Sequence, residues 1–260
     1  MEAIKDWFAN VWNNITGLGD IIAENVGSLL MFVAVIAALF AIAVISENLI
    51  CKKNGINKKS ERFRLNRMTL VAIMSAIAII LNMYGFPLPL IPGFYKLDFS
   101  DIPAVIGGFA MGPVAGVMIE FIKTLLNLVL NSTATAFVGE AALFIFGCTF
   151  VLPSSIIYFA NKSKKSAMKG LAAGVVLSLV LAAVLNAFLL IPTYAKVFFH
   201  SETIDPVIAA GTGENSAIGS LFTFVMFAVI PFNLVKYGVS MLITMFIYKP
   251  ISYLIKKKAD

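Results

Sequence analysis

Two pairs of polar side chains stand out because they interrupt otherwise apolar stretches of the sequence. Glu120 and Lys123 are three residues apart, and so are Asn233 and Lys236. Residues with this spacing share one face of a helix, and a charge in an apolar environment is unfavourable unless it is paired. We interpret Glu120 and Lys123 as an internal ion pair. A coupling site for an ion or a proton is the alternative.

Asn186, Asn233 and Lys236 have the side-chain chemistry needed to bind a polar ring. An asparagine amide offers both donors and acceptors, whereas a lysine offers donors only. If these groups face one cavity, they can bind a ring that carries a carbonyl–NH–carbonyl edge. Hydrogen bonding between helices is the alternative, and it would suffice for Asn186 alone. An unpaired lysine would be unfavourable at the position of Lys236. The occurrence of Lys236 three residues after Asn233 therefore favours a binding site.

Catalytic and nucleotide-binding motifs do not occur in the sequence. It contains no G-x-x-x-x-G-K-[ST] run, no H-E-x-x-H and no G-x-S-x-G. The single histidine is His200, and the two cysteines, Cys51 and Cys148, are too far apart for a metal or redox motif. No nucleophile–base pair is visible. We therefore predict that the chain is not an enzyme, holds no metal and does not bind ATP by itself.

The composition indicates an integral membrane protein. Hydrophobic residues make up 60% of the chain, charged residues 13%, and the mean hydropathy is +0.92. Soluble domains are about half apolar and about a quarter charged. The net charge of +6 comes from short basic clusters between apolar runs. This arrangement is typical of membrane topology and does not indicate nucleic-acid binding.

Seven runs are candidate transmembrane helices, since crossing the hydrocarbon core takes about 20 apolar residues. They are residues 26–46, 68–84, 100–112, 113–130, 138–160, 169–192 and 218–248. The third and fourth runs are separated by Gly112-Pro113 and are interpreted as a helical hairpin. Glu140 begins the fifth run, where an acid suits the helix dipole. We interpret it first as a cap and second as a site residue.

Basic residues predict the orientation of the chain. Most of the 20 basic residues lie in segments 52–67, 162–169 and 249–258, and such segments remain in the cytoplasm. Seven helices place all three on one side, with the N-terminus outside and the C-terminus cytoplasmic. We predict three parts: an extra N-terminal transmembrane helix with an acidic outer end (1–50), a basic cytoplasmic linker (51–66) and a six-helix membrane domain (67–260).

The predicted outer loop 85–99 has an unusual composition for a connection. It contains three prolines together with Phe86, Phe94 and Tyr95. Proline stiffens the backbone, so the loop can serve as a lid or as a pocket wall. A loop whose aromatic side chains only anchor it at the membrane interface is an equally acceptable interpretation.

Several short runs between residues 66 and 250 resemble one family of membrane proteins. The most specific are Lys96-Leu97-Asp98-Phe99-Ser100-Asp101 and Pro231-Phe232-Asn233-Leu234-Val235-Lys236, joined by Gly107-Gly108-Phe109, Glu120-Phe121-Ile122-Lys123 and Leu185-Asn186. They are similar to the riboflavin-specific substrate-binding (S) components of energy-coupling factor (ECF) transporters. Residues 1–65 have no counterpart in that six-helix pattern.

The resemblance implies a six-helix bundle that binds its vitamin from outside, under the loop that follows the first core helix. It implies that Asn186, Asn233 and Lys236 hydrogen-bond the flavin ring. We expect Phe86, Phe94 and Tyr95 to contact the ring. The other expected site residues are Lys96, Leu97 and Glu140.

The resemblance also implies partners. A small-residue strip on the first core helix, matched here by Ala72 and Ala76, docks on a transmembrane coupling subunit, and two cytoplasmic ATPase subunits complete the transporter. From the residues alone, the same strip is equally suited to packing inside this chain. We expect riboflavin to be the transported ligand and not a cofactor. The alternatives are an S component for folate, thiamin or a queuosine precursor, and a stand-alone ion-coupled transporter.

Overall fold

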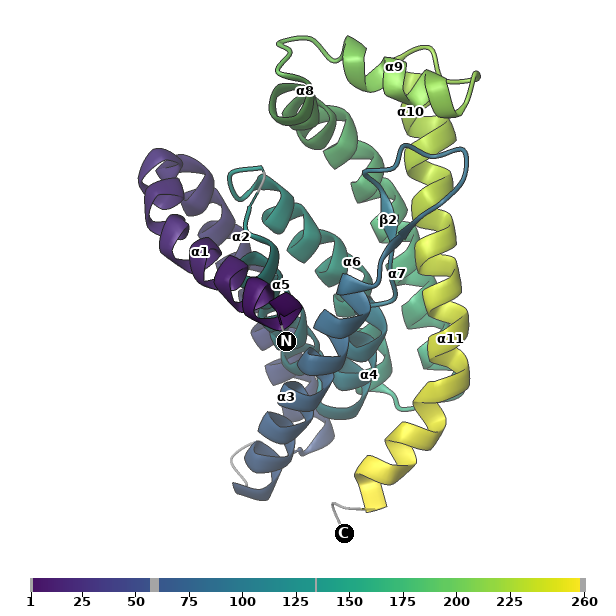
Figure 1. Ribbon diagram of the computed structural model, residues 1–260. Coiled ribbons are helices and arrows are strands. Elements are labelled where there is room, and N and C mark those ends of the chain that lie inside the picture. Colours follow the sequence, from purple (N-terminus) through teal and green to yellow (C-terminus); the bar gives the residue numbers. More distant parts are fainter. Residues whose placement is uncertain (1, 57–60, 134, 258–260) are drawn as a thin grey trace.

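The computed structural model describes residues 2–56, 61–133 and 135–257, and nearly all of them belong to helices (Figure 1). The α-helices are α1 (Glu2–Glu24), α2 (Val26–Asn54), α3 (Glu61–Met83), α4 (Asp101–Met111), α5 (Pro113–Asn131), α6 (Val138–Ala160), α7 (Lys164–Leu185), α8 (Ile191–Phe199), α9 (Asp205–Glu214), α10 (Leu221–Phe224) and α11 (Ile230–Lys257). Two π-helical turns, η1 (Asn186–Leu190) and η2 (Val225–Val229), join α7 to α8 and α10 to α11. Strands β1 (Phe86–Pro87) and β2 (Lys96–Leu97) form one short antiparallel pair.

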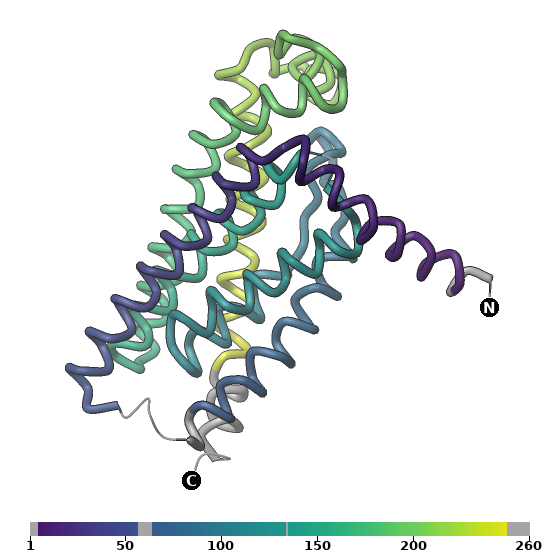
Figure 2. Tube along the Cα trace, turned by 90° about the vertical axis from the view of Figure 1, so that its left-hand side faces the viewer, coloured from purple at the N-terminus to yellow at the C-terminus, as the bar shows by residue number. Residues whose placement is uncertain are grey.

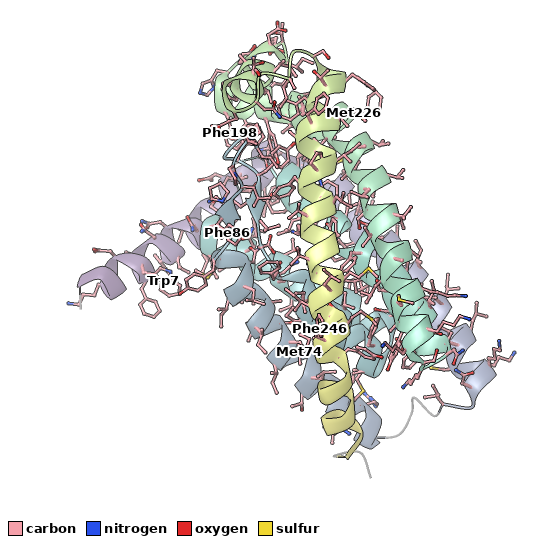
Figure 3. All side chains as sticks on the ribbon, turned by 90° about the vertical axis from the view of Figure 1, so that its right-hand side faces the viewer. Trp7, Met74, Phe86, Phe198, Met226 and Phe246 are labelled. Carbon is pink, nitrogen blue, oxygen red and sulfur yellow. The ribbon has the colours of Figure 1, made fainter. Side chains whose placement is uncertain are left out.

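Six helical stretches of the described chain are long and apolar enough to cross a membrane. They are residues 26–54, 64–83, 113–131, 138–160, 164–199 and 221–248. Large apolar side chains point outward from them, as Phe246 does on α11, where it is 80% exposed (Figure 3). Side chains of this kind are stable outside a bundle only if lipid surrounds it. The prediction of an all-α, multi-pass membrane protein is confirmed.

The predicted hairpin 100–130 is present, but its first helix is short. Helix α4 has 11 residues, about 16 Å at 1.5 Å per residue, which is less than the hydrocarbon thickness. The rest of this pass is the extended segment that contains β2. Irregular backbone at membrane depth is tolerated where protein surrounds it, and α4 is buried from Asp101 to Phe109. The chain then reverses at Gly112, whose φ of +99° favours glycine.

The two ends of the bundle differ in chemistry. One end, which we call the loop end, carries the segment 84–100 together with α8 and α9 (Figure 1). Helices α2 and α11 run from the loop end to the opposite end of the bundle (Figure 2). Lys52 and Lys53 lie at the opposite end, in the last turn of α2, and α7 begins there with its own lysines. Lys58, Lys59 and Lys258 lie outside the described residues.

Helix α2 is joined to the six-helix part by a buried carboxylate. Glu47 is 1% exposed and accepts hydrogen bonds from Arg67 of α3 at 2.9 and 3.1 Å. It also accepts one from the backbone N–H of Val114 at 3.0 Å, which satisfies a free donor in the first turn of α5. Helix α2 therefore holds two helices of the membrane domain together. The predicted linker 51–66 is largely helical, because α2 continues to Asn54 and α3 begins at Glu61.

We expect Glu47→Ala to destabilise the fold. The substitution leaves the Arg67 guanidinium and the Val114 N–H without this acceptor, which costs roughly 1–3 kcal/mol. For a chain of this size each kcal/mol lowers the melting temperature by about 2–4 °C, so the apparent melting temperature in detergent should fall by roughly 2–12 °C. The exposed acid Glu24 provides the control, since Glu24→Ala should leave the melting temperature unchanged. Equal melting temperatures for the two variants would contradict this role of Glu47.

Candidate functional site

A cavity of about 580 Å³ opens at the loop end of the bundle. Its volume is typical of sites for small organic ligands. The segment 84–100 and helices α3, α5, α6, α8 and α11, with η1, contribute its walls. The lining residues are Asn82, Met83, Phe94, Tyr95, Lys96, Asp98, Asn127, Asn131, Gly139, Ala142, Leu143, Phe146, Asn186, Leu190, Tyr194, Phe232, Asn233, Lys236 and Tyr237.

Aromatic rings form a continuous part of the cavity wall. The Phe94 ring centroid lies 4.9 Å from that of Tyr95 and 5.3 Å from that of Tyr194 on α8. Tyr95 in turn lies 5.3 Å from Phe232 on α11. Aromatic pairs at these distances are attractive beyond the area that they bury. The segment 84–100 is thus packed against two helices that line the same cavity.

Asn186 is tied to that segment by a hydrogen bond. It is the first residue of η1 and is 1% exposed. Its Nδ2 donates to the carbonyl of Ala182 at 2.8 Å, and its Oδ1 accepts from the Tyr95 hydroxyl at 2.5 Å. A phenol is protonated near neutral pH, so Tyr95 is the donor in this bond. Within the described chain these two bonds leave the Asn186 amide one N–H and one lone pair.

Asn233 is oriented in a similar way. It is 4% exposed, and its Nδ2 donates to the carbonyl of Val229 at 2.8 Å. Val229 ends η2, and Pro231 follows two residues later. In the same way Pro192 follows the end of η1 by two residues. Proline cannot donate a backbone bond, and a π-helical turn locally changes the hydrogen-bond register. Asn186 therefore lies within an irregular turn, and Asn233 lies one helical turn after another.

A buried cluster of five charged groups lies beside the polar part of the cavity. Lys236 lies 3.0 Å from Asp98 and 3.5 Å from Asp101. Lys123 lies 2.7 Å from Asp101 and 2.6 Å from Glu120. The predicted pair of Glu120 with Lys123 is confirmed, but it is one part of a network that joins the segment 84–100 and α4 to α5 and α11.

The structure brings most of the predicted site residues to one cavity. Those that line it are Asn186, Asn233, Lys236, Phe94, Tyr95 and Lys96. Three others do not line it. Phe86 is 47% exposed at the edge of the bundle (Figure 3). Leu97 packs in an apolar cluster with Tyr95. Glu140 lies in the first turn of α6 and accepts a hydrogen bond from Thr133 Oγ1 at 2.9 Å.

Two kinds of cavity residue were not predicted from the sequence. Asn82, Asn127 and Asn131 line the cavity from the last turns of α3 and α5. Asparagine at a helix end is ordinary, so its type alone carries no functional signal. Asp98 lines the cavity as the partner of Lys236. An unpaired lysine in an apolar helix requires such a partner, but the partner lies 138 residues away in the sequence.

Ala72 and Ala76 lie on the outer surface of α3. Both are exposed, whereas Ser75 and Ala78 of the same helix face the bundle. The interpretation that this strip packs inside the chain is therefore not supported within the described residues. The strip leaves α3 free to approach another helix closely.

We expect Asp98→Asn to loosen the segment 84–100. Asp98 binds Lys236 and also accepts from the backbone N–H of Ser100 at 2.9 Å, so the neutral amide should weaken the tie to α11. Amide hydrogen exchange of residues 85–97 should become faster, with little change in α5 or α6. Glu202→Gln breaks the exposed Lys196–Glu202 pair, 3.2 Å apart, and should leave that exchange unaltered. Unchanged exchange in Asp98→Asn would show that the ion pair does not hold the segment.

Comparisons with known proteins place this architecture in one family. The model of the family described as "ECF transporter, substrate-specific component" matches residues 66–248. The riboflavin transporter RibU of Staphylococcus aureus is 29% identical over 191 residues, which is 74% of this chain and 93% of the relative. The riboflavin transporter FmnP of Bacillus subtilis is 32% identical over 174 residues, 66% of this chain and 85% of the relative.

A solved structure agrees with the sequence comparisons. It is described as the S component of a bacterial ECF transporter, is 29% identical, and superposes with a TM-score of 0.57. The match covers 74% of this chain and 99% of that chain. The matched part is thus the whole of an S component, and the family model begins within α3, after α1 and α2. The chain belongs to the substrate-specific components of ECF transporters.

Proposed function

We propose that this chain captures riboflavin with high affinity and admits it to the cell as the S component of an ECF transporter. The observation that supports this most directly is the convergence of Asn186, Asn233 and Lys236 on one aromatic-lined cavity. Its relatives include proteins named riboflavin transporters in several bacteria. Riboflavin is the ligand and no cofactor is involved.

The chemistry of the cavity suits a flavin ring. The isoalloxazine system has a broad apolar body and one edge of alternating carbonyl and N–H groups. The rings of Phe94, Tyr95 and Phe232 offer flat apolar contacts. The Lys236 ammonium can donate to a carbonyl, and the two asparagine amides can donate and accept. A ligand pocket with a few convergent polar groups in an apolar wall is the usual design of such sites.

The same residues connect ligand binding to the position of the segment 84–100. Tyr95 and Asp98 belong to this segment, and they bind Asn186 and Lys236 respectively. A ligand that contacts Asn186 and Lys236 therefore contacts the residues that hold the segment in place. We infer that the segment is the lid of the site, and that ligand binding stabilises its closed position.

The charge distribution supports an orientation. Lys52, Lys53, Lys164 and Lys165 lie at the end of the bundle opposite the loop end. Basic residues next to membrane spans remain in the cytoplasm. The loop end of this cell-membrane protein then faces outward, so the vitamin enters from outside. The N-terminus also lies outside, and the C-terminus lies in the cytoplasm.

Energy for uptake comes from other chains. The sequence has no Walker A motif, so we propose that two cytoplasmic ATPase subunits supply it through a transmembrane coupling subunit. The exposed Ala72–Ala76 strip of α3 is the surface on which that subunit docks.

Removal of either asparagine amide should weaken riboflavin binding. Asn186→Ala or Asn233→Ala leaves a polar group of the ring unmatched, which costs roughly 1–3 kcal/mol and corresponds to about 5- to 150-fold in Kd. Quenching of riboflavin fluorescence by the purified protein measures this. Asn161→Ala, on an exposed asparagine beyond the end of α6, is the matched control. Unaltered Kd in both cavity variants, or copurification of a different vitamin detected by mass spectrometry, would contradict the assignment.

Bulky side chains on the Ala72–Ala76 strip of α3 should abolish riboflavin transport without affecting riboflavin binding. Ala72→Trp and Ala76→Trp add volume where a partner helix must approach, so both should lose copurification with the coupling subunit and cellular uptake. Their riboflavin Kd should not change, because neither residue lines the cavity. Val176→Trp, on an exposed position of α7, tests whether any added tryptophan has the same effect. Normal uptake by both α3 variants would rule out this docking surface.

A further inference from the structure

Helix α1 shows three distinct faces along its length. Val11, Leu18 and Ile21 are half-buried, and α1 packs against α5. A second face is polar and exposed, with Asp6, Asn13, Asp20 and Glu24. A third face is apolar and equally exposed: Trp7 is 44% exposed, Phe8 61%, Trp12 67%, Ile15 44% and Ile22 38%. Most of these apolar residues recur at the three- and four-residue spacing of one helix side.

A hydrogen bond fixes the position of α1 along the bundle, next to the last turn of α5. Asn14 Nδ2 donates to the carbonyl of Leu130 at 3.0 Å. Leu130 lies in the last turn of α5, where carbonyls have no partner within the helix. The membrane-spanning part of the chain begins directly after α1, at Val26 of α2. Helix α1 therefore lies where the apolar spans end, at the loop end of the bundle.

The direction of α1 is consistent with this position. It leaves α2 at a steep angle and extends away from the bundle (Figure 2). Trp7 lies on the part that projects furthest (Figure 3). An exposed apolar face of this length, next to a membrane span, marks a surface that contacts a membrane or another protein. Tryptophan is enriched at membrane–water boundaries, where its ring is partly apolar and partly polar.

We propose that α1 is an interfacial helix that lies in the membrane surface at the loop end. Phe8, Trp12 and Ile15 enter the boundary between headgroups and acyl chains, and the acidic face remains in water. The helix has one basic residue, Lys5, against the acids Glu2, Asp6, Asp20 and Glu24. Its contact with lipid therefore depends on apolar burial and not on attraction to anionic headgroups. The helix steadies the end of α5, from which Asn127 and Asn131 line the cavity.

The chain offers a direct test, because its 2 tryptophans, Trp7 and Trp12, both lie on α1. The full chain is placed in nanodiscs whose scaffold protein lacks tryptophan and whose zwitterionic lipids carry bromine either near the headgroup or deep in the acyl chain. We expect shallow bromine to quench the tryptophan fluorescence more strongly than deep bromine, and aqueous iodide to quench it weakly. Strong quenching by iodide without quenching by bromine overturns the proposal. So does the absence of both, because a second copy of the chain would then cover the face.

Single tryptophans identify the face that meets the lipid. In a Trp7→Phe, Trp12→Phe background, Ile15→Trp reports on the apolar face and Asn13→Trp on the polar face. Bromine should quench the first, and iodide the second. Equal responses at the two positions would show that α1 has no lipid-facing side. Elution as a single symmetrical peak in size-exclusion chromatography confirms that each variant is folded, and the result does not depend on the identity of the vitamin.

Discussion

The structure depends on ion pairs, because charged side chains buried in an apolar bundle need partners of opposite charge. Lys123 is fully buried, and Lys236 is only 8% exposed. An unpaired ion in such a place is strongly unfavourable. The acids that neutralise them come from three positions along the chain, Asp98, Asp101 and Glu120. This requirement brings the segment 84–100, α4, α5 and α11 to one point. It also explains why a single network can support both the cavity and the segment 84–100 beside it. Glu120 lies 2.6 Å from Lys123 within this network, which fits their interpretation as an internal ion pair.

The cavity is built around that network by elements that are not ideal helices. Strand β2 leads into a helix of 11 residues, and η1 precedes α8. Helix α4 is buried from Asp101 to Phe109, and η1 turns Asn186 and Leu190 toward the cavity, so much of the irregular backbone has protein around it. A regular bundle of straight helices would bury its side chains against each other. Departures from regularity leave room for a ligand and direct Asn186 and Asn233 toward it.

The spans, the hairpin and the pair of Glu120 with Lys123 could be predicted from the sequence, because hydropathy and helical spacing are local properties. The buried carboxylate of Glu47, with partners on α3 and α5, could not, because those contacts join distant parts of the chain. Helix α1 was missed for a different reason. Its apolar residues are spread along one side of the helix and form no continuous apolar run. In the sequence, this region is therefore notable only for its acidic residues. The positions of Phe86, Leu97 and Glu140 off the cavity wall followed from backbone geometry that residue type does not encode.

The π-helical turn η2 has a consequence for the numbering of the last span. A π-turn accommodates one residue more than an α-helix does over the same axial length. If residues Val225–Val229 were wound as a regular α-helix with no residue removed, everything on one side of the turn would rotate by about 100° relative to the other. Asn233 and Lys236 would then turn away from η1 and α5 together. The π-turn thus keeps Asn233 and Lys236 directed toward the cavity. A homologue that lacks the extra residue must carry the matching groups at positions shifted by one in its sequence.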